Sequence, residues 1–124
     1  MGGKDDYLRW VLEQLSGAEG ISSRRMFGAF GLYRHDVFFA IISDDTLYFK
    51  VSDSSRADYE TRGMARFRPY RDKPQVSMSY YEVPADVIED AEECMRWAMR
   101  AVAASVAKEK SPRRVKPRTY TSRR

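Results

Sequence analysis

Two residue types that often carry catalysis occur once each in this sequence, His35 and Cys94. His35 lies in the polar stretch 34–36 between two apolar runs, so we interpret it as an exposed turn histidine. Cys94 lies beside the apolar stripe of a predicted helix, where nothing nearby in sequence would lower its pKa, and we interpret it as a packed side chain. With one histidine and one cysteine, a zinc site of the usual ligand spacing cannot be built within one chain.

Other patterns that resemble catalytic motifs have simpler interpretations. The pairs Asp44–Asp45 and Glu92–Glu93 fit a turn and a solvated helix face better than an acid–base pair. The segment Gly28–Gly31 is not a phosphate-binding loop, because it does not open a helix and is not followed by Lys-Ser or Lys-Thr. Its glycines favour a bulge or a close strand contact instead. We therefore predict a non-enzymatic protein with no catalytic residue, no metal and no cofactor.

Charge is distributed unevenly along the 124 residues, whose formal net charge is +4. Residues 108–124 hold eight lysines and arginines against the single acid Glu109, a net charge of +7, whereas the other 107 residues hold fourteen bases and seventeen acids, a net charge of −3. We predict that 108–124 is a disordered basic tail, since it has two prolines and little to bury. The tail is a candidate nucleic-acid-binding segment through Lys108, Lys110, Arg113, Arg114, Lys116, Arg118, Arg123 and Arg124.

A second candidate surface mixes cations with aromatic rings, as nucleic-acid contact surfaces do. Arginines alternate there with Phe67 and Tyr70, and the alternative is that the rings pack inward while the arginines are solvated. Of the pair Tyr80–Tyr81, we expect one ring to face the core and the other a partner. The predicted partner surface comprises Arg66, Arg68, Tyr70, Arg71 and Tyr81.

The stretch 24–53 consists of apolar or alternating runs separated by short polar turns. Turns this short join only antiparallel strands, because a parallel crossover needs a dozen or more residues. Alternation places one set of side chains on a single face, and 37–42 is apolar throughout, as in a strand covered on both faces. We predict an antiparallel meander entered through a loop at Ser22–Ser23. Its core side chains are Phe30, Leu32, Phe38, Ala40, Leu47, Phe49 and Val51.

Helical periodicity flanks the meander on both sides. We predict a helix over 4–15, a short helix capped by Asp53 or Ser54 and ended by Gly63, and one long helix from Pro84 to about Lys108. The long helix would cover the sheet with Ile88, Ala91, Met95 and Val102. A strand over 76–81 would close the sheet. The class is α+β, in the order α-β-β-β-β-α-β-α.

Composition bears on the cellular compartment, and several motifs match a known domain family. No signal-peptide core or membrane-length apolar run is present, and a single cysteine fits a reducing cytoplasm. The motifs Arg25-Met26-Phe27-Gly28, Leu47-Tyr48-Phe49-Lys50 and Tyr80-Tyr81-Glu82-Val83-Pro84 resemble the N-terminal domain of the TfoX/Sxy family. The resemblance covers roughly residues 5–107 and leaves out the tail. We therefore expect a family domain over 1–107, with 108–124 as the tail.

Full-length members of the family that this chain resembles are bacterial regulators of competence genes, which act with the cyclic-AMP receptor protein at particular promoters. Full-length members carry a second, helical domain that this sequence lacks, so we expect a stand-alone N-terminal domain. The resemblance implies no catalytic residue. We predict a regulatory module that works through protein contacts with transcription machinery or a regulator. The alternative is non-specific nucleic-acid binding through the tail. A separate prediction is a homodimer, formed if the edge strand expected near 76–81 pairs with the same strand of a second copy.

Overall fold

The computed structural model describes residues 3–26, 28–69 and 79–110. Every helix in these ranges is too short or too polar to cross a bilayer. The predicted α+β class and the order of the elements are confirmed, except that the last helical region forms two helices. In chain order the elements are α1 (Gly3–Gln14), β1 (Ile21–Met26), β2 (Ala29–Arg34), β3 (Val37–Ser43), β4 (Thr46–Lys50), α2 (Asp53–Glu60), β5 (Tyr80–Glu82), α3 (Ala85–Glu89) and α4 (Ala91–Lys110).

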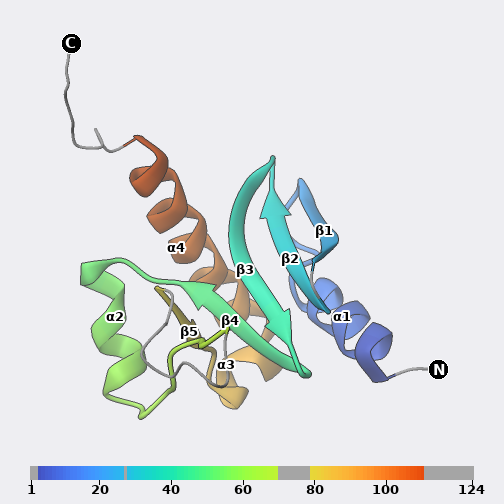
Figure 1. Cartoon of the computed structure of the whole chain (residues 1–124), viewed down its shortest axis with the longest axis horizontal. Coiled ribbons are helices and arrows are strands. Elements are labelled where there is room, and N and C mark those ends of the chain that lie inside the picture. The colour runs from blue at the N-terminus through green and yellow to red at the C-terminus, as the bar shows by residue number, and fades with distance from the viewer. Residues whose placement is uncertain (1–2, 27, 70–78, 111–124) are drawn as a thin grey trace.

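Five strands form one antiparallel sheet in the order β1-β2-β3-β4-β5, as the meander prediction requires (Figure 1). Two of its hairpins turn on residue pairs with positive φ. His35 and Asp36 have φ of 49° and 69°, and Asp44 and Asp45 have φ of 52° and 56°. Positive φ at both central residues is the type I′ geometry, whose twist matches that of paired strands. The turn interpretation of Asp44–Asp45 is confirmed.

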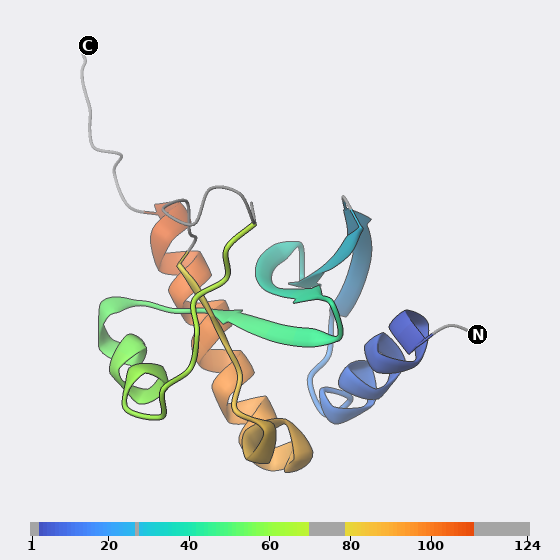
Figure 2. The same ribbon diagram turned by 60° about the horizontal axis from the view of Figure 1, so that its bottom comes forward.

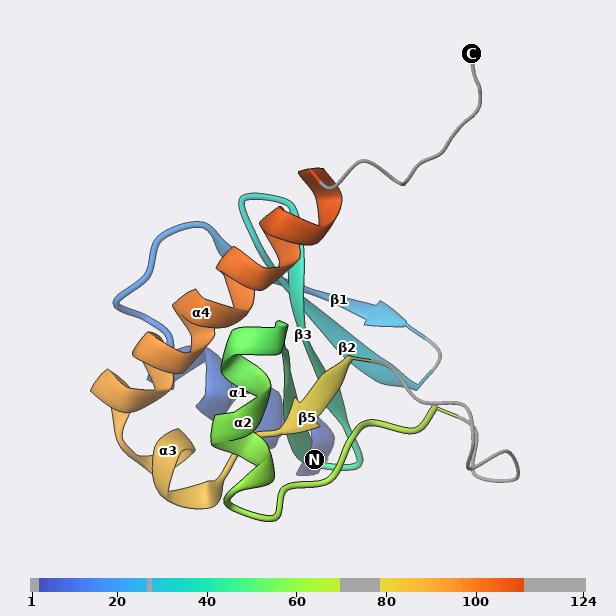
Figure 3. The same ribbon diagram turned by 90° about the vertical axis from the view of Figure 1, so that its left-hand side faces the viewer.

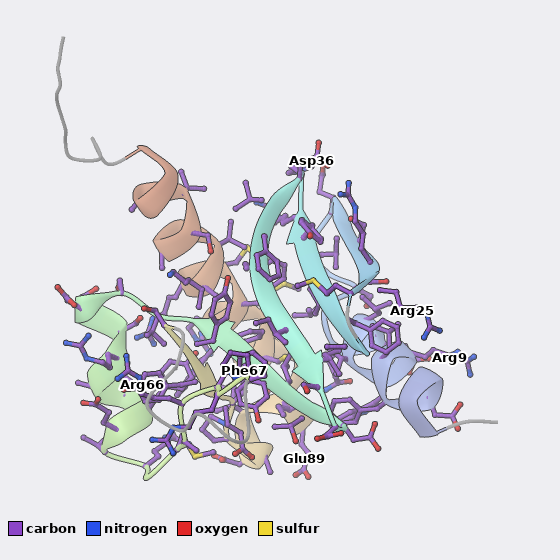
Figure 4. All side chains as sticks on the ribbon, viewed as in Figure 1. Arg9, Arg25, Asp36, Arg66, Phe67 and Glu89 are labelled. Atoms are coloured by element: carbon purple, nitrogen blue, oxygen red, sulfur yellow. The ribbon has the colours of Figure 1, made fainter. Side chains whose placement is uncertain are left out.

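Replacing Asp36 with Gly should stabilise the fold. Asp36 is exposed at the tip of the β2–β3 hairpin, pays the cost of a left-handed backbone, and is shown there in Figure 4. Glycine removes that cost, so we expect the free energy of unfolding to rise by up to about 1 kcal/mol. Asp36→Ala should not raise it, because alanine keeps the strain of the left-handed backbone. Chemical denaturation of both variants checks the prediction, which would fail if glycine and alanine behaved alike.

A β-bulge in β3 corrects one core prediction. Leu32 pairs with Ala40, but Tyr33 pairs with Phe38, so Phe39 is an extra residue opposite β2. The bulge sends Phe39 into the core, where it is fully buried against Phe49 with ring centroids 6.0 Å apart. Phe38 lies on the other face of the sheet and is half-buried. The other six predicted meander positions are buried, namely Phe30, Leu32, Ala40, Leu47, Phe49 and Val51.

Helices cover one face of the sheet, with α4 packed across β3 and β4 and α1 beside α3 and α4 (Figures 2 and 3). The 20 residues of α4 make it about 30 Å long, so its C-terminal part extends beyond the strands. The predicted stripe of the first helix is confirmed: Val11 and Leu15 are fully buried, and Tyr7, Leu8 and Leu12 pack against the core.

The last helical region breaks at Asp90, which corrects the predicted single helix. Asp90 has extended backbone angles, and its carboxylate accepts the N–H groups of Glu92 and Glu93, so it begins α4 as an N-terminal cap. The break turns α4 relative to α3, so the predicted stripe is out of phase: Ala91 is exposed, and Met95 and Val102 are only half-buried, whereas Ile88 is buried. The buried side chains of α4 are Cys94, Trp97, Ala98, Ala101, Ala104 and Ser105.

Two further local predictions change. The cap of α2 is Ser52 rather than Asp53 or Ser54, and Ser52 and Ser55 each accept the other's backbone N–H in a capping box. The expected left-handed Gly63 is confirmed, at φ 73°. Residues Ser22–Ser23 belong to strand β1 and not to a loop, because they pair with Tyr33 and Leu32.

Candidate partner-binding surfaces

The predicted partner surface begins beside β5, along residues 65–67. The N–H of Phe67 donates to the carbonyl of Tyr80 at 2.8 Å, and the N–H of Glu82 donates to the carbonyl of Ala65 at 2.9 Å. Because β4 pairs with β5 on its other side, the described part of the edge expected to make a homodimer already has neighbours on both sides. Residues 70–78 lie outside the described residues, and the homodimer stays a prediction.

Tyr81 is not at the surface, which corrects its place in that prediction. Its side chain is 3 % exposed, its hydroxyl donates to the Glu60 carboxylate at 2.6 Å, and its ring packs on Tyr59 with centroids 5.7 Å apart. Burial and the Glu60 carboxylate raise the pKa of Tyr81. The reason is the pairing with Phe49, which turns Tyr81 toward the helices and leaves Tyr80 on the other face of the sheet. Tyr81 therefore fixes α2 to the sheet.

The arginines of this surface remain accessible. Arg66 is exposed, and its guanidinium lies 5.7 Å from the centroid of the Tyr81 ring; Arg68 is exposed as well. Phe67 is half-buried and packs on Tyr48 with centroids 4.9 Å apart. Because Tyr48 alternates with the buried Leu47 and Phe49, this contact lies on the sheet face opposite the helices, and the Phe67 ring does not enter the core. Tyr70 and Arg71 lie outside the described residues. The structure thus keeps Arg66 and Arg68 as candidate contacts from the original five.

A row of rings lies on the sheet face opposite the helices. Phe38 contacts Tyr33 and Tyr80, with centroids 5.2 and 5.7 Å apart. Burial, with the neighbouring Tyr33 hydroxyl, raises the pKa of Tyr80 to about 12. The bulge in β3 creates this row by moving Phe38 to the outer face. Alternation alone could not reveal it.

Sequence reasoning missed two arginines on the edge strand β1. Arg24 and Arg25 are both exposed and point to opposite faces of the sheet. The Arg24 guanidinium lies 4.9 Å from the Tyr33 ring centroid, and that of Arg25 lies 5.2 Å from the Phe30 ring centroid. Figure 4 shows Arg25 on the side of the molecule formed by β1 and α1. The available signal was an Arg-Arg pair in a short strand, which becomes informative only once that strand is known to form the edge.

A third charged region joins α2, α3 and α4. The guanidiniums of Arg62 and Arg100 lie 5.3 and 5.5 Å from the centroid of the buried Trp97 ring. Arg62 pairs with Asp86 at 3.0 Å, and Arg100 pairs with Asp58 at 2.6 Å. Because each arginine links two elements, we assign this region to helix packing.

The basic tail is described only at its start. Helix α4 continues through Lys110, three residues beyond the expected boundary at 107, so the backbones of Lys108 and Lys110 are helical. The remaining predicted nucleic-acid contacts lie outside the described residues. They are Arg113, Arg114, Lys116, Arg118, Arg123 and Arg124.

His35 and Cys94, the two residues that could have carried catalysis, lie in a hairpin turn and in the hydrophobic core. His35 is exposed in its turn, its N–H donates to the carbonyl of Gly20 at 2.9 Å, and its ring lies where a side chain on residue 20 would be. Cys94 is fully buried, and burial raises the pKa of its thiol to about 11. In the described ranges, no group of three or more His, Cys, Asp and Glu side chains is placed to hold a metal ion.

Alkaline pH should destabilise the fold, because the Cys94 thiol and two tyrosine hydroxyls are buried in their protonated forms. A thiol whose pKa is raised by folding keeps a proton that the unfolded chain loses, so stability falls as pH rises above the ordinary thiol value and stops falling near pH 11. The slope for Cys94 is at most about 1.4 kcal/mol per pH unit. Burial also raises the pKa values of Tyr7 and Tyr80 to about 12, which extends the fall above pH 10.

Denaturant unfolding at pH 8 and 10 measures this effect, and Cys94→Ala is the matched variant. The variant should show a smaller loss between the two pH values than the parent. Equal losses in both chains would show that Cys94 does not contribute.

The arrangement as a whole defines a small α+β domain with charged and aromatic surfaces on an antiparallel sheet. The chain belongs to the TfoX N-terminal domain family, whose model matches residues 13–105. It is also similar to the DNA transformation protein TfoX1 of Aliivibrio fischeri, with 27 % identity over 81 residues. That match covers 60 % of this chain and 39 % of the relative, so the chain spans about two fifths of the length of this curated relative. Family membership thus relates residues 13–105 of this chain to the TfoX proteins.

Proposed function

We propose that this chain is a non-enzymatic regulatory module that binds a protein of the transcription machinery. The contact is made by the domain of residues 1–107, called the folded body below, and not by the tail of residues 108–124. One observation carries the proposal: the family match covers residues 13–105, which is nearly the whole folded body and excludes the basic tail. A property shared by the family therefore resides in the sheet and its helices. The body carries a net charge of −3, so its contacts depend on local groups such as Arg24, Arg25 and Arg66 rather than on overall attraction to polyanions.

Purified proteins provide the direct test. The full chain is immobilised and presented separately with bacterial RNA polymerase holoenzyme and with the cyclic-AMP receptor protein, with and without cyclic AMP. We expect saturable binding of at least one of them at 150 mM salt. Binding should survive an excess of random duplex DNA, which removes contacts made only through the tail. No saturable binding of either protein would overturn the proposal.

A second function has its own supporting observation. The net charge of +7 in residues 108–124 favours contact with any polyanion, and lysine and arginine contacts to phosphate do not distinguish base sequence. Under this alternative the tail binds nucleic acid without a preferred site and the body serves as a scaffold.

A further inference from the structure

We propose that the free edge of β1 is a docking site for an extended acidic segment of a partner protein, which adds to the sheet as a sixth strand. The proposal rests on the proposed function, since it names the surface and the chemistry of that protein contact. In the part of the chain that the structure describes, β1 pairs with β2 alone and ends the sheet (Figure 1). An edge strand of this kind is a template for strand addition.

The register identifies which backbone groups are available at this edge. The His35 N–H donates to the Gly20 carbonyl at 2.9 Å, so the residue pairs bonded to β2 are those in step with Gly20, including Ser22 and Arg24. Residues between them in an antiparallel strand direct their N–H and carbonyl groups away from the neighbour. Ile21 and Ser23 therefore present their backbone groups outward, along the edge of the sheet.

Two arginines give this edge a chemical preference. Arg24 and Arg25 lie on opposite faces of β1, and both are exposed. Their stacking on Tyr33 and Phe30 holds the guanidiniums beside the sheet, where side chains of an added strand would lie about 4.5–5.5 Å away. Like charges directly opposite each other destabilise a strand pair, so a second copy of this chain is disfavoured in any pairing centred on the arginines. An acidic strand is favoured for the same reason.

The register also predicts a sequence pattern for the partner. Antiparallel addition, the commoner geometry, places consecutive partner residues opposite Arg25, Arg24, Ser23, Ser22 and Ile21. Acids suit the first two positions. An apolar residue suits the last, because Ile21 is half-buried and packs against the hydrophobic core. The expected segment is therefore acid-acid-x-x-apolar in an extended conformation.

The probe is a capped, fluorescein-labelled peptide with the sequence Thr-Glu-Asp-Thr-Thr-Val-Thr, and its matched control carries Gln-Asn in place of Glu-Asp. Fluorescence polarisation measures the affinity, and amide chemical shifts map the site on the full chain. We expect the acidic peptide to bind about threefold to tenfold more tightly than the control and to shift the amides of Ile21 and Ser23 most. Equal affinities, or shifts centred on another element, would overturn the proposal.

Ser23→Pro tests the backbone contact, because it deletes an outward N–H and leaves the bonds to β2 in place. Ser23→Ala keeps that N–H and is the matched control. With both variants folded by circular dichroism, Ser23→Pro should weaken peptide binding by about tenfold or more, and Ser23→Ala by less than about twofold. Unchanged binding by Ser23→Pro would overturn the docking site. Arg24→Glu with Arg25→Glu is a second test that leaves the backbone intact, and it should reverse the preference between the two peptides.

The same variants separate this proposal from the proposed function. If Ser23→Pro binds the transcription protein as tightly as the parent chain does, the β1 edge is wrong and the proposed function stands. If the parent binds the peptide at β1 but neither transcription protein, the proposed function is wrong and the docking site stands.

Discussion

Phe49→Ala should lower the free energy of unfolding by about 3–5 kcal/mol. Phe49 is a fully buried residue of β4, packs on Phe39, and lies on the sheet face that α4 covers. Truncation leaves a cavity that the bulged β3 and the long α4 can fill only in part. The variant therefore loses the transfer free energy of the removed ring and also incurs the free-energy cost of the cavity. That loss is a large share of the roughly 5–15 kcal/mol that stabilises a domain of this size.

Urea denaturation followed by circular dichroism measures the loss. Thr46→Ala is the control, since Thr46 lies on the same strand, is half-buried, and loses one exposed hydrogen bond to the Asp44 carbonyl. We expect that control to cost no more than about 1 kcal/mol. A Phe49→Ala chain as stable as Thr46→Ala would contradict the assigned core.

Binding to random duplex DNA should weaken steeply as salt rises. If the tail contacts about five phosphates, the slope of log K against log salt is about −4 to −5, which is roughly a 500-fold loss between 50 and 200 mM salt. Deleting residues 111–124 removes six of the eight basic residues of the tail and preserves the described part of α4. We expect the deletion to abolish DNA binding and to leave the unfolding transition unchanged.

A chain of full length with those six bases changed to glutamine is the matched control, and it should behave like the deletion. Equal DNA binding by the parent and the deleted chain would place the contact on the body. Arg66 and Arg68, which are both exposed, would then be the first residues to change.

Local alternation predicted most of the sheet because its period is set by covalent geometry. Six of the seven meander core positions are buried as expected. Phe38 is the exception, since a bulge reverses the face of every residue before it and no composition signal marks Phe39 as the extra residue. The prediction of a single last helix was wrong for a different reason. The periodicity of 88–102 suits an uninterrupted helix, but α4 begins anew at Asp90, and this break shifts the buried face.

The candidate surfaces were harder to predict than the core. Whether Tyr80 or Tyr81 faces the helices depends on the register with β4, which sequence alternation leaves undecided, and both rings are buried. The aromatic and arginine mixture near residue 66 was a visible signal. The Arg24–Arg25 pair was visible as well but uninformative, because its meaning depends on β1 being the last strand of the sheet.

The central claim is that the folded body, and not the basic tail, carries the specific protein contact. The most direct test compares the full chain with a chain ending at Lys110 for affinity to the transcription protein that the parent binds, at 150 and 500 mM salt. We predict that the two affinities agree within about twofold at each salt concentration, because the deleted residues hold no part of the body. Loss of binding on deletion, together with a steep salt dependence of the parent, would contradict the claim and assign the contact to the tail.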